Sequence, residues 1–224
     1  MDRIARPTFE PTAVALLIGA PLLMSLGRLL LVPFDDQGWG SVLTHAAAHQ
    51  TSSDVGWLLA MAASGLLCAA ALSLARMLHV AGSTRAAAFA GVSTALGWAG
   101  SAGICAGGLL LSYMGKAPNR AVQVKLLTDF NAGHSFYVFL LCVLGALGYV
   151  VLAVGLARSG LIGKGAASLV AIGGVGTLLT MPGPLKALLV TAALVLFAGQ
   201  VLVVRGFRTV GTSELEPMTE TAIA

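Results

Sequence analysis

The sequence predicts an all-α polytopic membrane protein: a compact bundle of six transmembrane helices with both the N- and the C-terminus in the cytoplasm. Composition is the first observation, because 57% of the 224 residues are hydrophobic, only 10% are charged, and the mean hydropathy is +0.90. Soluble domains carry about 25% charged residues and cannot bury so much apolar surface. The second observation is that the apolar residues form six separate stretches, and the third is that most basic residues fall between alternate stretches.

Most of the six apolar stretches have about the 20 residues that cross a bilayer as a helix. They run approximately over residues 12–34, 55–75, 86–114, 134–157, 166–181 and 185–204. The first contains Arg28 and is too long for a signal-peptide core, so we interpret it as a helix of the mature protein. The third is long enough to tilt or to extend beyond the membrane. The fifth is the shortest and stops at the helix-breaking run Met181-Pro182-Gly183-Pro184, which is typical of the tight outer turn of a helical hairpin.

The basic residues indicate which helix ends face the cytoplasm. Eight lie on one side of the predicted bundle: Arg3, Arg6, Arg76, Arg85, Arg158, Lys164, Arg205 and Arg208. Four lie on the other side: Lys116, Arg120, Lys125 and Lys186. Because cytoplasmic loops carry the excess of Lys and Arg, we expect residues 1–208 to form one six-helix domain with cytoplasmic ends. Residues 209–224 are polar and acidic, which predicts a disordered cytoplasmic tail.

Two loops on the predicted outer side are long enough to carry structure of their own. They cover residues 35–54 and 115–133, and each contains a helix-like patch, at 42–50 and at 120–130. Short interfacial helices are expected there. The 13 basic residues of the chain form no dense patch, so nucleic acid is not an expected partner.

Glycines and cysteines within the apolar stretches point to packing. Among the 28 glycines, Gly97, Gly100, Gly103 and Gly107 share the third stretch, and the last two form a GxxxG pair. Small residues let membrane helices approach closely, so we interpret these glycines as sites of tight packing within the chain rather than as a dimer interface. The cysteines also lie in apolar stretches, without CxxC spacing, and are interpreted as small buried hydrophobic residues: Cys68, Cys105 and Cys142.

Arg28 is the charge that lies well inside an apolar stretch, where an arginine costs about 3 kcal/mol at the bilayer centre. Two interpretations remain open. The side chain extends outward to Asp35, Asp36 or lipid headgroups, or it faces a cavity and binds a polar or anionic ligand. In the second case the tryptophans are candidate lining residues, which adds Trp39, Trp57 and Trp98 to Arg28 as candidate ligand-binding residues.

Histidines and acids on the outer side suggest a different chemistry. His45 and His49 form an HAAAH motif that on a helix places both imidazoles on one face, as a metal site requires. The candidate acid/base residues on that side are Asp35, Asp36, Asp129 and His134. Such residues also gather in any water-facing loop, and Ala46 stands where the zinc metalloprotease motif has glutamate.

The segment from His134 to Thr177 contains a long apolar helix, an Arg158-Ser159-Gly160 turn and then a Gly-rich helix. In these features it resembles a broad group of uncharacterised six-helix bacterial integral membrane proteins, a domain of unknown function. The resemblance implies six spans, a sizeable first outer loop and a location in the bacterial cytoplasmic membrane. It implies no activity, cofactor or site residue.

These observations favour a membrane protein that binds or moves a small apolar or amphipathic molecule, or an accessory membrane protein. The chain contains no Walker A motif with which to bind nucleotide. The alternative is a membrane-embedded enzyme that acts on a lipophilic substrate with the outward-facing Asp and His residues. Membrane lipids and a lipophilic small molecule are the expected partners, and the sequence indicates neither a cofactor nor an oligomeric state.

Overall fold

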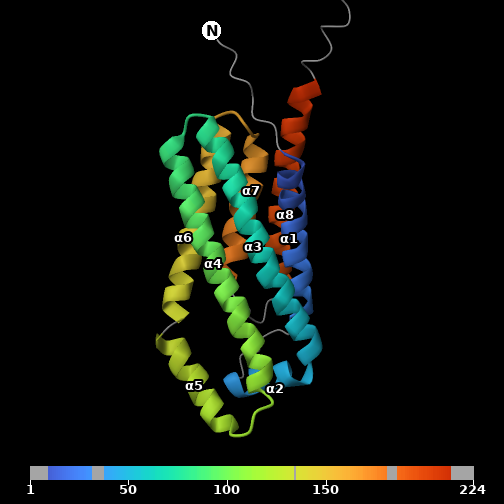
Figure 1. Cartoon of the computed structure of the whole chain (residues 1–224), viewed down its shortest axis with the longest axis vertical. Coiled ribbons are helices and arrows are strands. Elements are labelled where there is room, and N and C mark those ends of the chain that lie inside the picture. The colour runs from blue at the N-terminus through green and yellow to red at the C-terminus, as the bar shows by residue number, and fades with distance from the viewer. Residues whose placement is uncertain (1–9, 32–37, 134, 181–185, 213–224) are drawn as a thin grey trace, which may run out of the picture.

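Eight α-helices and no strands form the described part of the chain in the computed structural model, which covers residues 10–31, 38–133, 135–180 and 186–212 (Figure 1). The helices are α1 (Pro11–Leu30), α2 (Trp39–Ala48), α3 (Gln50–Val80), α4 (Thr84–Met114), α5 (Arg120–Gly133), α6 (Ser135–Arg158), α7 (Lys164–Leu179) and α8 (Lys186–Thr212). The all-α prediction is therefore confirmed. Of the tail predicted at 209–224, residues 209–212 belong to α8, and the remainder lies outside the described residues, as do Asp35, Asp36 and His134.

Five helices, α1, α3, α4, α6 and α8, are long and apolar enough to cross a membrane. The fifth predicted span, at 166–181, corresponds to α7, which is apolar but has only 16 residues. At 1.5 Å per residue it measures about 24 Å. Helices able to span a membrane are thus confirmed, while the count of six spans and the cytoplasmic position of the termini stay predictions.

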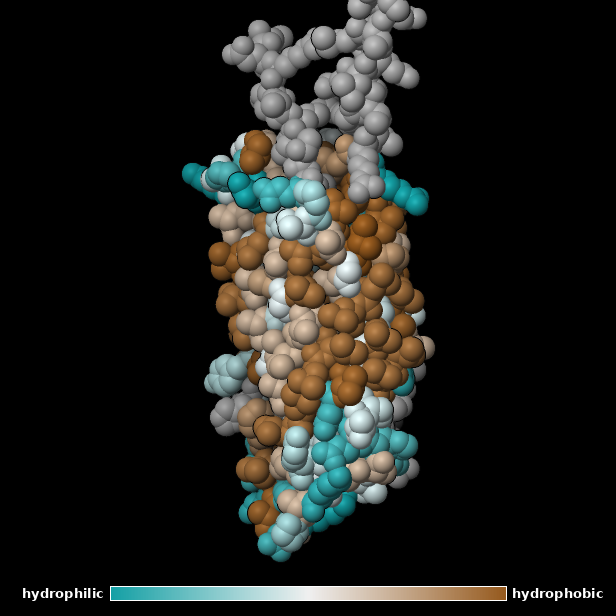
Figure 2. All heavy atoms as spheres, turned by 45° about the vertical axis from the view of Figure 1, so that its right-hand side comes forward, coloured by the Kyte–Doolittle hydropathy of each residue, from teal (hydrophilic) through white to brown (hydrophobic). Residues whose placement is uncertain are grey.

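Helices α1, α3, α4, α6, α7 and α8 close into a ring. In space α1 packs on α3, α3 on α4, α4 on α6, α6 on α7, α7 on α8, and α8 returns to α1. All six run along the long axis of the molecule in Figure 1. Figure 2 shows a band of hydrophobic side chains around the middle, with hydrophilic side chains gathered toward both ends of that face. This belt is the surface that a bilayer would cover.

Glycines allow the closest helix contacts of the ring. A Cβ on Gly97 of α4 would lie 2.5 Å from the Cα of Gly145 on α6, and one on Gly173 of α7 would lie 2.3 Å from the main-chain N of Leu196 on α8. The predicted tight packing is confirmed at these positions. It is wrong for Gly103 and Gly107, where a Cβ would meet nothing within 4 Å, because these two glycines face open space beside α4.

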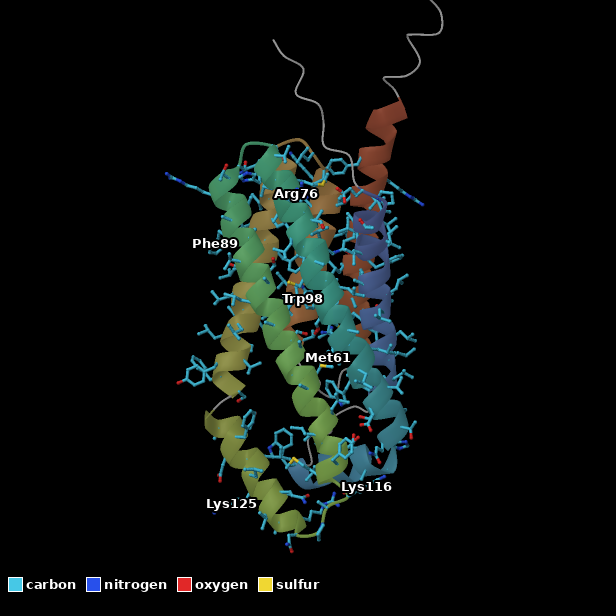
Figure 3. The ribbon with its side chains drawn as sticks, viewed as in Figure 1. Met61, Arg76, Phe89, Trp98, Lys116 and Lys125 are labelled. Carbon is cyan, nitrogen blue, oxygen red and sulfur yellow. The ribbon has the colours of Figure 1, made fainter. Side chains whose placement is uncertain are left out.

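Helices α2 and α5 sit together at one end of the bundle, and we call them the cap. They correspond to the two interfacial helices predicted at 42–50 and 120–130. Helix α2 buries Val42, Leu43 and Ala46 against Leu111 of α4, and Leu127 of α5 packs on the same small cluster. Lys116 and Lys125 mark the cap end of the molecule in Figure 3, and Arg76 marks the opposite end.

Candidate functional site

An apolar pocket of about 630 Å³ lies where the bundle meets the cap. Five aromatic side chains from four helices line it: Trp39 of α2, Trp57 of α3, Phe130 of α5, and Phe136 and Phe139 of α6. Gly103, Gly107 and Leu111 of α4 form the opposite wall, and Asn131 and Ser135 supply the polar groups. A concave apolar site with few polar groups, within the usual range of about 300–1,000 Å³, has the character of a small-molecule site.

The pocket exists because α4 extends further toward the cap than α6 does. Gly100 of α4 packs against Val138 and Leu141 of α6, close to the start of α6 at Ser135, whereas α4 continues to Met114. Helix α5 packs on α6 and α2, so it leaves the next turns of α4 uncovered. Gly103 and Gly107 share this uncovered face because residues four apart lie one above the other on a helix. Since neither carries a side chain, the space stays open.

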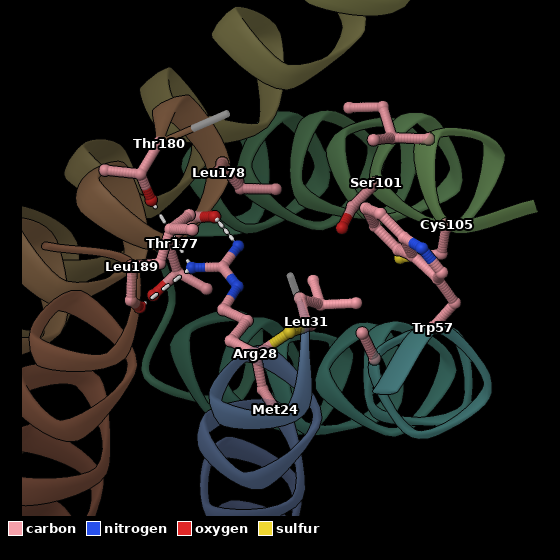
Figure 4. A pocket seen from close by; sticks show the side chains of 12 residues that line it. Met24, Arg28, Leu31, Trp57, Ser101, Cys105, Thr177, Leu178, Thr180 and Leu189 are labelled. Carbon is pink, nitrogen blue, oxygen red and sulfur yellow. Dashed lines mark hydrogen bonds between the residues drawn. The ribbon is translucent and has the colours of Figure 1, made fainter. Parts of the chain in front are cut away.

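Arg28 lines a second, smaller cavity of about 30 Å³, which we call the Arg28 chamber. Its other walls include Trp57, Ser101, Cys105 and Thr177 (Figure 4). Arg28 is only 7% exposed, although it lies two residues before the end of α1. The chamber therefore holds a buried cation at the cap end of α1.

The guanidinium of Arg28 ties α1 to α7 and α8. Nη1 donates to the carbonyl of Leu189 at 3.1 Å and to the hydroxyl of Thr180 at 3.3 Å, and Nη2 donates to the carbonyl of Thr177. Thr177 belongs to the last turn of α7, whose carbonyls have no partner within the helix and attract positive charge. The expectation that Arg28 extends outward to lipid headgroups is therefore wrong, because its side chain turns inward to these helix ends. The expected partners Asp35 and Asp36 lie outside the described residues.

Trp57 and Ile104 line both cavities, so they form the wall between the apolar pocket and the Arg28 chamber. Trp57 is 4% exposed. A Cβ on Gly108 of α4 would lie 2.2 Å from its indole ring, which means that the ring packs directly on the α4 backbone. These two side chains are thus the lining that the apolar pocket and the chamber have in common.

The remaining tryptophans divide between the pocket and the core. Trp39 lines the apolar pocket. Trp98 lines neither cavity and is 1% exposed in the middle of the bundle (Figure 3). Its Nε1 donates to the hydroxyl of Tyr149 at 3.1 Å, with the two rings edge to face at 6.1 Å. Trp98 therefore acts as a packing residue between α4 and α6.

The histidine and acid candidates do not come together in the described part of the chain. His45 and His49 are both exposed, and the helix breaks at His49, so the two imidazoles do not share one regular helix face. Asp129 is exposed on α5. Over the described ranges, no three His, Cys, Asp or Glu residues are grouped as a metal ion requires, and no His, Asp or Glu lines either cavity. The described residues therefore give no support to metal or acid/base chemistry.

Several lining residues were missed by the sequence analysis. Of the eight phenylalanines in the chain, three lie within ten residues at Phe130, Phe136 and Phe139, and this cluster was a usable signal. Ser64 and Ser101 pair inside the bundle, with their hydroxyl oxygens 3.1 Å apart, beside the chamber. Such a contact between α3 and α4 has no sequence signature, because it depends on the register of the two helices.

Comparison with known proteins adds no family: no family model matches the chain, and neither a curated protein nor a solved structure is significantly similar to it. Function is therefore argued from the two cavities.

Proposed function

We propose that this protein binds a small apolar or amphipathic molecule in the apolar pocket between α4, α6 and the cap. The observation that carries the proposal is the pocket itself, about 630 Å³ in volume and walled by five aromatic side chains. Aromatic and aliphatic walls favour a lipophilic ligand because they remove apolar surface from water without requiring polar partners. Asn131 and Ser135 provide two polar groups that orient one end of such a molecule.

The position of the pocket supports loading from the membrane. Phe136 and Phe139 line the pocket and are also 63% and 43% exposed on the surface of α6. Lipid-soluble molecules would therefore reach the space sideways, past the start of α6, without crossing water. The predicted orientation places the cap on the outer face of a bacterial cytoplasmic membrane, so the ligand would come from the outer leaflet. The same pocket suits a carrier that moves the molecule or an accessory protein that holds it.

The proposal is tested by filling the pocket. Gly107→Leu adds a side chain where a Cβ meets no atom within 4 Å, so it occupies ligand space without straining the helix. The probe is a photoactivatable diazirine analogue of hexadecanol, presented to the purified protein in phosphatidylcholine nanodiscs. We expect labelling of the α4, α5 and α6 pocket residues, reduced about tenfold in Gly107→Leu, the equivalent of ~1.4 kcal/mol of binding free energy.

The matched control is Gly65→Leu. Gly65 is exposed on α3, its Cβ position is equally open, and it lines neither cavity, so this variant should label like the wild type. Labelling spread evenly over the lipid-facing residues, and equal in all three proteins, would contradict the proposal.

A further inference from the structure

Among the described residues, the Arg28 guanidinium has acceptors for three of its five N–H groups. Of its five N–H groups, two on Nη1 and one on Nη2 are used by Thr180, Leu189 and Thr177. Within the described ranges, no acceptor is recorded for Nε–H or for the second Nη2–H. Those two N–H groups lie on the same edge of the planar guanidinium, the edge that grips a carboxylate with two parallel hydrogen bonds.

The unused edge faces the chamber. In Figure 4 the three hydrogen bonds leave the guanidinium toward Thr177, Thr180 and Leu189, and the space of the chamber lies on its other side, in the direction of Ser101, Cys105 and Trp57. The recorded acceptors are two main-chain carbonyls and one hydroxyl, so none of them carries a negative charge. A buried cation is normally paired with an anion, because desolvation of an unpaired charge is costly.

The size of the chamber limits what can pair with Arg28. A single water needs about 10–15 Å³ of such space, so a chamber of about 30 Å³ holds a group of roughly two or three heavy atoms. A carboxylate has three heavy atoms and presents two acceptor oxygens at the spacing of the guanidinium edge. A phospholipid headgroup, with its ester-linked substituents, is too large.

We infer that the ligand is a long-chain carboxylic acid in its ionised form, with its carboxylate on Arg28 and its hydrocarbon chain in the apolar pocket. Trp57 and Ile104 line both spaces, so a ligand that occupies both requires these two side chains to move apart and admit its hydrocarbon chain. The inference rests on the proposed function, since it uses the same pocket. It adds the chemical class of the ligand and gives Arg28 the role of headgroup receptor.

The test compares two probes that differ only in the headgroup. Diazirine analogues of hexadecanoic acid and hexadecanol are added to the protein in phosphatidylcholine nanodiscs, and labelling of the pocket residues is measured at a pH at which the acid is ionised. In the wild-type protein we expect the acid to label the pocket at about tenfold lower concentration than the alcohol, because a charge-assisted pair replaces an uncharged contact. This comparison needs no substitution and so does not depend on whether a variant folds.

Two variants assign the preference to Arg28. Arg28→Gln should lose the preference for the acid and keep labelling by the alcohol, and Arg28→Lys, which retains the charge, should restore part of it. Equal labelling by acid and alcohol in the wild type, or a preference that survives in Arg28→Gln, would overturn the inference while leaving the pocket as a lipophilic site. Absence of pocket labelling by both probes would overturn the inference and the proposed function together.

Discussion

At the scale of single residues, Arg28 holds three helices at one point. It belongs to α1, it donates to a carbonyl in the last turn of α7, and it donates to a carbonyl in the first turn of α8. Satisfied backbone groups matter more inside a membrane than in a soluble protein, because no bulk water replaces a lost donor. Arg28 is therefore both a structural tie and, in the inference above, a receptor for charge.

This double role gives a stability prediction. Arg28→Leu leaves the carbonyl of Thr177 without its donor, which should lower the free energy of unfolding by about 1–3 kcal/mol. Unfolding in mild detergent, followed by circular dichroism as denaturant is added, measures the change. Leu29→Ala is a suitable comparison, because the neighbouring Leu29 is 54% exposed on the same helix and should cost less. A fully stable Arg28→Leu protein would show that the tie contributes nothing.

The sequence singled out Arg28 and Trp57 but could not give the direction of either side chain. An intramembrane arginine near a helix end has two low-energy options, the headgroup region and a buried acceptor. The choice depends on α7 ending beside α1, a contact between segments about 150 positions apart in the chain. The tight fit of Trp57 on Gly108 was hidden for the same reason, since a glycine reveals close approach only when its neighbour is known.

At the scale of elements, the glycines of α4 have two opposite uses. Gly97 and Gly100 are in contact with α6, and Gly103 and Gly107 leave the pocket open. All four lie on one helix within eleven residues, so a single stretch of small residues serves packing at one end and ligand space at the other. The division falls where α6 begins at Ser135.

Alanine substitutions distinguish the two uses. Gly97→Ala places a methyl group 2.5 Å from the Cα of Gly145, and backbone atoms cannot move aside as a flexible side chain would. We expect a loss of about 1–3 kcal/mol in the free energy of unfolding, as for other overpacked sites. Gly103→Ala, with no atom within 4 Å, should be neutral or slightly stabilising because alanine is the better helix former. Equal effects of the two substitutions would contradict this assignment.

Hydropathy located the helices well because burial in lipid is a property of each helix alone. The predicted spans at 86–114 and 134–157 and the patches at 42–50 and 120–130 all correspond to observed helices. The predicted 55–75 span lies within α3, which also includes polar residues at both ends and runs from Gln50 to Val80. The pocket could not be predicted from the sequence. It depends on α5 packing on α2 and α6, which leaves Gly103 and Gly107 of α4 uncovered.

At the scale of the whole molecule, the ring of six helices has basic residues at both of its ends. Arg76, Arg85, Arg158 and Lys164 lie at the end opposite the cap, near the turns that join α3 to α4 and α6 to α7. Lys116, Arg120, Lys125 and Lys186 lie at the cap end. Arg3, Arg6, Arg205 and Arg208 are predicted on the side of the first group, so the positive-inside bias predicts that this side faces the cytoplasm and that the cap faces outward.

Cysteine accessibility tests this orientation. In a background with Cys68, Cys105 and Cys142 replaced by alanine, single cysteines are placed at the exposed residues Ala117, beside the cap, and Ser159, at the opposite end. A membrane-impermeant maleimide added to intact cells should label Ala117→Cys and leave Ser159→Cys unlabelled until the cells are opened. The reverse pattern would invert the predicted topology and place the pocket at the cytoplasmic leaflet.

The short helix α7 has a consequence for the surrounding bilayer. Its 16 residues measure about 24 Å, whereas the hydrocarbon layer is about 30 Å thick, and Ile172 of this helix is 63% exposed. With α7 as the predicted span, lipids beside it would have to shorten or tilt their chains, at a cost of a fraction of a kcal/mol per Å. The bilayer would be thinner next to the end of α7 whose Thr177 carbonyl accepts a hydrogen bond from Arg28. In a thinner membrane this mismatch disappears, so we expect the fold to be more stable in thin bilayers than in thick ones.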